Sequence, residues 1–317
     1  MRKFLVSAVI CGSFLLALAC FSPGHAQAAD FAGAEACRSC HEDYYKSYTK
    51  SIHGKKYVPG SPARGEDCEA CHGPGAAHAE KGGGKGSIIA FSKNMNVKEK
   101  SAKCLACHQD SKDLAFWGMS KHKTSGFSCD SCHSVHKGAT PLQPTAGYLN
   151  KPVQGKALKL PTPDLCFGCH KDVRSQTMRQ SHHPIREGKL LCGSCHVPHG
   201  GFGPKMVKAD SINELCFKCH AEKRGPFMME HPPVAENCLN CHVAHGSNHY
   251  ALLVSKTPQL CQSCHDAAFH PGQPYTNFET FKGQSPSNRM VSRNCVLCHT
   301  QVHGGNSLTD RGQRFLR

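Results

Sequence analysis

The chain has one long apolar stretch, and it lies at the N-terminus. Residues 4–21 are predominantly apolar, two basic residues precede them, and the small residues of Ala26-Gln27-Ala28 follow a Ser-Pro-Gly break. This pattern predicts a secretory signal peptide over residues 1–28. Two alternatives are an uncleaved anchor helix and a lipid attached at Cys20, although Ala17 stands where a lipidation site would have leucine.

Beyond residue 28 the apolar positions are scattered. No other segment approaches the ~20 apolar residues that span a bilayer, so no transmembrane helix is expected after cleavage. The sequence shows no sustained alternation typical of strands. Short polar segments rich in Gly, Pro, Lys and Ser separate Cys-rich motifs spaced 22 to 37 residues apart. We therefore expect a mostly irregular fold with short α-helices.

The apolar composition is too low for an ordinary core. Leu, Ile, Val and Phe total 57 of 317 residues, about 18% and below the roughly 20% at which disorder becomes a plausible alternative. Either the chain stays open or something other than side chains is buried. The 22 cysteines and 23 histidines indicate what that is.

All twenty cysteines outside the signal peptide belong to ten copies of Cys-x-x-Cys-His. The cysteines are Cys37, Cys40, Cys68, Cys71, Cys104, Cys107, Cys129, Cys132, Cys166, Cys169, Cys192, Cys195, Cys216, Cys219, Cys238, Cys241, Cys261, Cys264, Cys295 and Cys298. The histidines that close the motifs are His41, His72, His108, His133, His170, His196, His220, His242, His265 and His299.

This motif is the attachment signature of c-type haem. Residues at i, i+3 and i+4 share one helix face, so one turn presents two thiols to the haem vinyl groups and an imidazole to the iron. Structural zinc would need paired Cys-x-x-Cys units without the recurrent His, and a thioredoxin-like redox pair does not occur ten times. The sequence predicts ten covalently bound haem c groups, with the motif histidines as proximal ligands.

Twelve further histidines remain in the mature chain, enough to give every iron a second imidazole. We predict bis-histidine ligation, with His182 or His183 and also His249 as the two spare residues. The distal ligands chosen are His53, His78, His122, His136, His183, His199, His231, His245, His270 and His303.

Four of these distal candidates follow a motif histidine by only three or four residues: His136, His199, His245 and His303. None can reach the far face of its own haem, so each should bind a neighbouring one. Interleaved ligands of this kind predict closely spaced haems organised as a chain. Five motifs lie on each side of residue 180, which predicts two five-haem halves, 29–180 and 181–317.

The formal charge is +15, and +13 once the two signal-peptide cations are removed. An exported protein rarely meets nucleic acid, so we expect no nucleic-acid partner. Ten oxidised haems with two propionates each would bring the net charge to about +3, which makes most Lys and Arg side chains propionate partners.

Several segments resemble the decahaem electron-conduit cytochromes of the MtrA/DmsE family beyond the haem motif itself. They are Cys68 to Pro74 (CEACHGP), Cys104 to Asp110 (CLACHQD), Cys219 to Pro226 (CHAEKRGP), Glu230 to Cys241 (EHPPVAENCLNC) and Gln301 to Gly304 (QVHG). The resemblance favours His183, the histidine directly before proline. The internal repeat favours His182 instead, because His231 lies two residues before Pro233.

The resemblance implies an elongated multihaem cytochrome that threads an outer-membrane β-barrel porin and exchanges electrons with periplasmic and extracellular redox proteins. Its location would be the periplasm, at the outer membrane, with electrons passing to extracellular metals or from ferrous iron. At roughly 10 Å per haem, ten in line span on the order of 100 Å, against a ~30 Å hydrocarbon layer. A soluble periplasmic carrier feeding a terminal reductase is the alternative. A nitrite or hydroxylamine reductase is disfavoured, because it would need an open iron position.

Overall fold

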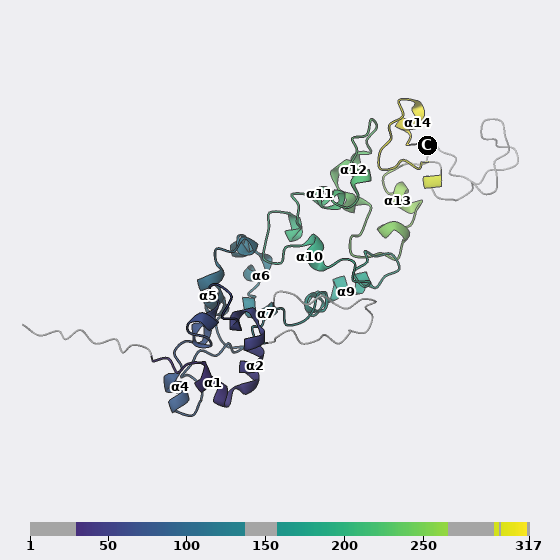
Figure 1. Ribbon diagram of the computed structural model, residues 1–317. Coiled ribbons are helices and arrows are strands. Elements are labelled where there is room, and N and C mark those ends of the chain that lie inside the picture. Colours follow the sequence, from purple (N-terminus) through teal and green to yellow (C-terminus); the bar gives the residue numbers. More distant parts are fainter. Residues whose placement is uncertain (1–29, 137–156, 266–294, 298, 316–317) are drawn as a thin grey trace, which may run out of the picture.

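The structure is a computed structural model that describes residues 30–136, 157–265, 295–297 and 299–315. The chain forms an elongated molecule in which short helices follow one another in sequence order, from α1 and α2 at one end to α12 and α14 at the other (Figure 1). Extended pairing within the described part of the chain is limited to isolated bridges. The expected fold class, short α-helices in mostly irregular backbone, is confirmed.

Fourteen α-helical segments lie in the described residues. They are α1 (Ala34–Cys40), α2 (Glu42–Lys50), α3 (Glu69–His72), α4 (Ala76–Glu80), α5 (Val97–His108), α6 (Lys121–Thr124), α7 (Cys129–Cys132), α8 (Asp164–Phe167), α9 (Lys171–Thr177), α10 (Cys192–Cys195), α11 (Ile212–Phe217), α12 (Pro232–Glu236), α13 (Gln259–Gln262) and α14 (Asp310–Gln313). The 3₁₀ turns are η1 (Ile52–Gly54), η2 (Pro62–Arg64), η3 (Lys112–Leu114), η4 (Trp117–Met119), η5 (Pro204–Met206), η6 (Ala221–Lys223), η7 (Cys238–Asn240), η8 (Tyr250–Leu252) and η9 (Cys295–Leu297).

Each Cys-x-x-Cys-His motif is wound into one helical turn. In nine of the ten motifs the backbone N–H of the histidine donates to the carbonyl of the first cysteine at 2.9–3.1 Å. The third motif forms the end of α5, the longest helix at 12 residues, which begins at an Asn96 side chain that accepts from the Lys98 amide at 2.8 Å. The motif itself therefore sets the local conformation that haem attachment requires.

The polypeptide buries very little apolar surface of its own. Among the described residues the buried apolar side chains are only Tyr48, Ala63, Trp117, Phe167 and Val207. A core of five side chains cannot offset the conformational entropy of more than two hundred ordered residues. The remaining stabilisation has to come from covalently attached groups between the helices.

The chain turns back beside several motifs in a repeated way. His196 pairs with Val207, and His242 with Leu253, as antiparallel bridges 11 residues apart. The turns between them contain Lys205 and Ala251, both at φ 54°. In this repeat the Lys205 carbonyl lies next to His196 and the Ala251 carbonyl lies next to His242.

The division at residues 180 and 181 stays a prediction. Described contacts cross it: the Ser120 hydroxyl donates to the Pro198 carbonyl at 3.2 Å, and the rings of Phe116 and Phe202 lie 4.4 Å apart. Residues before and after position 180 are therefore in direct contact with each other.

A buried carboxylate fastens the N-terminal end of the described chain to the second motif. Glu69 is 3% exposed, and its two oxygens accept from the amides of Ala32, Gly33 and Gly75 at 2.8, 2.9 and 2.7 Å. Hydrogen bonds to a charged group contribute about 1.5–3 kcal/mol each.

We expect Glu69→Ala to reduce hydrogen-exchange protection of these three amides by about 100-fold or more, equivalent to roughly 3 kcal/mol. Hydrogen exchange read by mass spectrometry checks this. Glu66→Ala is the matched control, because Glu66 is exposed three residues away. Unchanged protection in Glu69→Ala would contradict the assignment.

Candidate haem sites

Nine motif histidines face a second imidazole at nearly the same distance. The ring centres lie 5.9–6.4 Å apart in every pair. In motif order the pairs are His41–His78, His72–His136, His108–His53, His133–His199, His170–His122, His196–His245, His220–His183, His242–His303 and His265–His231.

This separation fits an iron held between two imidazoles. Metal–nitrogen bonds of about 2.0 Å on each side place the ring centres roughly 6 Å apart. The donor set also fits, because two nitrogen ligands flank each position and the two thiols of the motif lie one helical turn away. Covalently bound c-type haem therefore suits both the motifs and the space between the rings.

Backbone carbonyls orient many of these rings through Nδ1. For motif histidines the contacts are His72 to Ile89 O (2.7 Å), His196 to Lys205 O (3.1 Å), His242 to Ala251 O (2.8 Å) and His299 to Arg314 O (2.5 Å). With Nδ1–H donating to a carbonyl, Nε2 is the unprotonated nitrogen that can bind a metal. The turn at φ 54° described above supplies the carbonyl for His196 and His242.

Four distal candidates are held in the form that binds metal. Burial lowers the pKa of His53, His136, His245 and His303. The facing motif imidazoles lower it further, and at His303 the charge of Lys223 does so before them. A lowered pKa favours the neutral imidazole, which is the ligating species.

The four histidines that follow a motif closely do not face their own motif. His199, three residues after His196, lies 6.0 Å from His133 instead. His245 and His303 likewise lie against the motifs two positions earlier. The structure thus brings each of them to the motif two positions earlier in the chain, while their role as axial ligands stays a prediction.

The adjacent histidines at 182 and 183 have different surroundings. The ring of His183 lies 6.3 Å from His220. His182 Nδ1 contacts the Arg179 carbonyl at 2.6 Å, and its Nε2 lies 3.2 Å from Glu187. His182 and His249 face no motif imidazole among the described residues. The structure therefore distinguishes His183, which faces a motif histidine, from His182, which does not; the sequence left this choice open.

Two predicted site residues, Cys298 and His270, lie outside the described residues. The tenth motif is represented by Cys295 and His299, whose backbone closes the same helical turn at 2.9 Å.

Consecutive motifs contact each other through their first cysteines. Burial and the neighbouring Cys37 thiol raise the pKa of Cys68 to about 12, and the hydrogen bond to Cys129 raises that of Cys104. Five such contacts join each odd-numbered motif to the next: Cys37–Cys68, Cys104–Cys129, Cys166–Cys192, Cys216–Cys238 and Cys261–Cys295.

The second cysteines link the remaining neighbours. Burial, and then the nearby thiol of Cys107, raise the pKa of Cys71. The same relation joins the sixth motif to the seventh and the eighth to the ninth, through Cys195–Cys219 and Cys241–Cys264. At the fourth motif, burial and then the thiols of Cys166 and Cys169, both in the fifth motif, raise the pKa of Cys132. The attachment sites therefore follow one another in space in their order along the chain.

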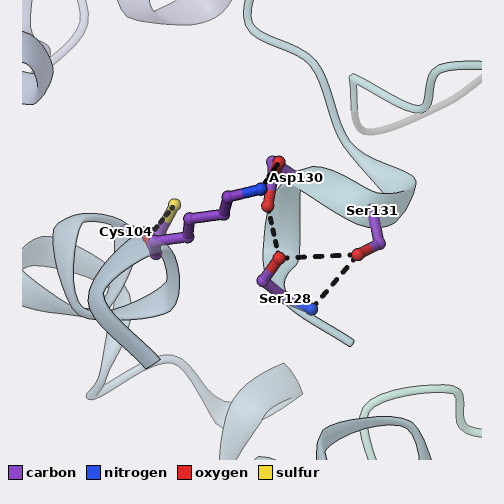
Figure 2. A network of polar contacts seen from close by, with 5 residues as sticks. Cys104, Ser128, Asp130 and Ser131 are labelled. Atoms are coloured by element: carbon purple, nitrogen blue, oxygen red, sulfur yellow. Dashed lines mark hydrogen bonds and ion pairs between the residues drawn. The ribbon is translucent and has the colours of Figure 1, made fainter. Parts of the chain in front are cut away.

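A partly buried ion pair links the third and fourth motifs (Figure 2). Lys100 Nζ in α5 lies 3.3 Å from Asp130 in α7, with side chains 10% and 29% exposed. Burial raises the pKa of Asp130, but hydrogen bonds from Ser128 and Lys100 outweigh it and hold the pKa below its ordinary value. Sequence analysis missed this pair, because no local pattern connects residues 30 positions apart.

Two features are absent from the described part of the chain, which does not include the predicted signal peptide, residues 1–28. No group of three or more His, Cys, Asp or Glu side chains there could hold a metal ion by itself, as structural zinc would require. No helix in the same residues is long and apolar enough to cross a membrane.

Known proteins show the same motif content. Residues 182–225 and 231–270 match the family model for the doubled CXXCH motif, and residues 68–148 match the model for NrfB-like c-type cytochrome proteins. The chain is 36% identical over 279 residues to the multihaem cytochrome MtrA of Shewanella baltica, covering 86% of this chain and 79% of that protein.

Two longer relatives are more distant. The polyhaem c-type cytochrome OmcB of Geobacter sulfurreducens is 27% identical over 71% of this chain and 27% of its own length. The high-molecular-weight cytochrome c of Nitratidesulfovibrio vulgaris is 28% identical over 83% of this chain and 44% of its own length. This chain therefore spans less than half of either.

Proposed function

Because the chain belongs to the MtrA family of multihaem c-type cytochromes, we propose that it passes electrons between the periplasm and the cell exterior from inside an outer-membrane β-barrel partner. Membership makes it an electron-transfer protein. The barrel, the outer-membrane location and extracellular metals as redox partners are the parts that we propose.

We propose that each of the nine described histidine pairs provides both axial ligands of one iron, and that His299 and His270 do so for the tenth. A bound haem c supplies an iron that takes up and releases one electron. The paired imidazoles would hold the iron from both sides, and the carbonyls at Nδ1 orient many of these rings, among them His72, His122 and His183. An enzyme acting on nitrite or hydroxylamine would need an open position, so the pairs favour electron transfer over catalysis.

The observation that carries this proposal is the unbroken order of the attachment sites. Hydrogen bonds between first cysteines alternate with electrostatic influence between thiols of the next two motifs, from the first motif to the tenth. The short helices follow one another along the long axis of the molecule (Figure 1). A linear arrangement suits a protein that connects two separated partners. Irregular backbone at membrane depth is tolerated where a closed barrel surrounds it.

The alternative is a soluble periplasmic carrier feeding a terminal reductase, since the same ligands would serve it. The proposed halves, 29–180 and 181–317, would face opposite sides of the membrane in a conduit and have no such roles in a carrier. Topology therefore separates the two functions.

Liposomes that enclose a reduced dye, with an impermeant oxidant outside, test the conduit. We expect dye oxidation only when the holo-cytochrome and its co-purifying barrel protein are both present. Replacing Cys216 and Cys219 by serine removes the seventh attachment site and should slow oxidation strongly. If the cytochrome binds no barrel from outer membranes yet rapidly reduces a periplasmic reductase, the carrier is the correct function.

A further inference from the structure

Three short loops with the same form follow the sixth, eighth and tenth motifs. Each consists of a residue whose backbone carbonyl contacts a distant histidine, then a histidine and a glycine: Pro198-His199-Gly200, Ala244-His245-Gly246 and Val302-His303-Gly304. The glycines adopt φ of 107°, 156° and 138°, values that a residue with a Cβ rarely adopts. The same carbonyl-histidine-glycine loop thus occurs three times in the chain.

In the first loop, two adjacent groups serve two different sites. The ring of His199 lies 6.0 Å from His133, in the fourth motif. The carbonyl of Pro198, one residue earlier, lies 2.8 Å from Nδ1 of His122. His122 in turn lies 6.2 Å from His170, in the fifth motif.

The other two loops repeat this geometry at the next sites. The Ala244 carbonyl lies 2.6 Å from His183 Nδ1, and the Val302 carbonyl lies 3.0 Å from His231 Nδ1. The loops therefore join the sixth site to the seventh, and the eighth to the ninth.

We propose that each loop is a shared positioning element for two consecutive haems. Its histidine occupies an axial position at the even-numbered site, while its carbonyl orients and polarises the distal imidazole of the next odd-numbered site. This inference rests on the proposed axial ligation. An Nδ1–H bond to a carbonyl makes an imidazole a stronger electron donor, and stronger donation stabilises ferric iron and lowers its reduction potential.

The glycine allows the loop to approach the segment that carries the odd-site histidine. A Cβ on Gly200 would lie 2.4 Å from the Phe116 carbonyl, and one on Gly246 would lie 2.0 Å from the Gln176 carbonyl. Both carbonyls belong to the segments that lead to the odd-site histidines. Any side chain there would push the loop away from His122 or His183.

Paired backbone hydrogen bonds hold two of the loops in register. Ser181 and Ser247 exchange N–H···O bonds of 3.0 and 2.8 Å, and Met229 and Gly305 exchange bonds of 2.9 Å. In both cases the partners lie two residues before the odd-site histidine and two residues after the loop histidine. In the first loop, the Ser120 hydroxyl instead donates to the Pro198 carbonyl at 3.2 Å.

The junction between the second and third sites shows what happens without this device. His136 lies 6.0 Å from His72, but lysine follows it where the loops have glycine. His53 faces His108, and its Nδ1 is buried with no hydrogen-bond partner among the described residues. At the third site, therefore, no carbonyl of the described residues polarises the distal imidazole.

Adjacent glycines provide a matched test in the holo-protein. Gly200→Ala should alter the ferric EPR g-values and reduction potentials of two haems out of ten, with the potential of the fifth haem rising. Gly201→Ala should alter none, because the nearest atom to its Cβ is 3.9 Å away. A change confined to one haem, or equal changes in both variants, would overturn the shared role.

Two further measurements keep the test decisive if Gly200→Ala does not fold. Nδ1-methylhistidine at position 122 removes only the donor to Pro198 and leaves Nε2 for the iron, so the fifth-haem potential should rise while the iron stays low-spin; an unchanged potential refutes the polarising role. His199→Ala should make one iron high-spin. If it does not, the axial ligation is wrong, which is a failure distinct from that of the shared loop.

Discussion

Without covalent haem attachment, the mature chain is expected to remain unfolded. Five buried apolar side chains form its whole apolar core within the described residues, while the many glycines, 30 in the full sequence, raise the entropy cost of ordering the backbone. Binding energy of a group around which a chain folds becomes folding energy. Expression in a host without the attachment machinery should yield a chain with no cooperative thermal transition and complete sensitivity to protease.

The same gene expressed with the attachment machinery is the control, and it should give a protease-resistant core. The haem-free chain has to be examined under a reductant, because thiols such as Cys104 and Cys129 lie in contact and would otherwise form disulfides. A cooperative transition, or slowly exchanging amides in helices such as α5, would show that the polypeptide folds alone.

Replacing His183 by methionine is expected to raise the potential of one haem in ten. Its ring faces His220, and axial ligands tune haem potentials over a range of about 0.8 V, with methionine at the higher end. We expect a shift on the order of 0.1 V for the seventh haem, measured by potentiometric titration. His183→Ala should instead convert that iron to a high-spin form, visible by EPR as about one tenth of the total haem.

His182 is the matched control, since it is the adjacent residue and the same side chain. Its ring is held by the Arg179 carbonyl and Glu187, so His182→Ala should leave all ten haems low-spin. A high-spin signal in His182→Ala but not in His183→Ala would reverse the assignment. A high-spin signal in the unmodified protein would contradict bis-histidine ligation and favour an enzyme.

The local spacing of residues was enough to predict the attachment chemistry and the class of fold. Positions i, i+3 and i+4 lie on one helical turn whatever surrounds them, so Cys-x-x-Cys-His identified the haem sites, and the low apolar content indicated short helices around buried cofactors. The order of the sites in space did not follow from the sequence, because linkers of 22 to 37 residues can bring motifs together in more than one order. The close spacing of His199 after His196 also predicted that His199 lies at another motif.

Which imidazole faces which motif was decided only by the tertiary structure. His122 and the Pro198 carbonyl are 76 residues apart, and Lys100 and Asp130 are 30 apart, so no period or motif connects them. At positions 182 and 183 the sequence offers the same side chain twice. Next to the backbone bridge between Ser181 and Ser247, the His183 ring faces His220 and the His182 ring lies beside Glu187. This arrangement distinguishes the two residues. Long-range contacts of this kind depend on where distant segments meet, which is a property of the folded chain and not of any local pattern.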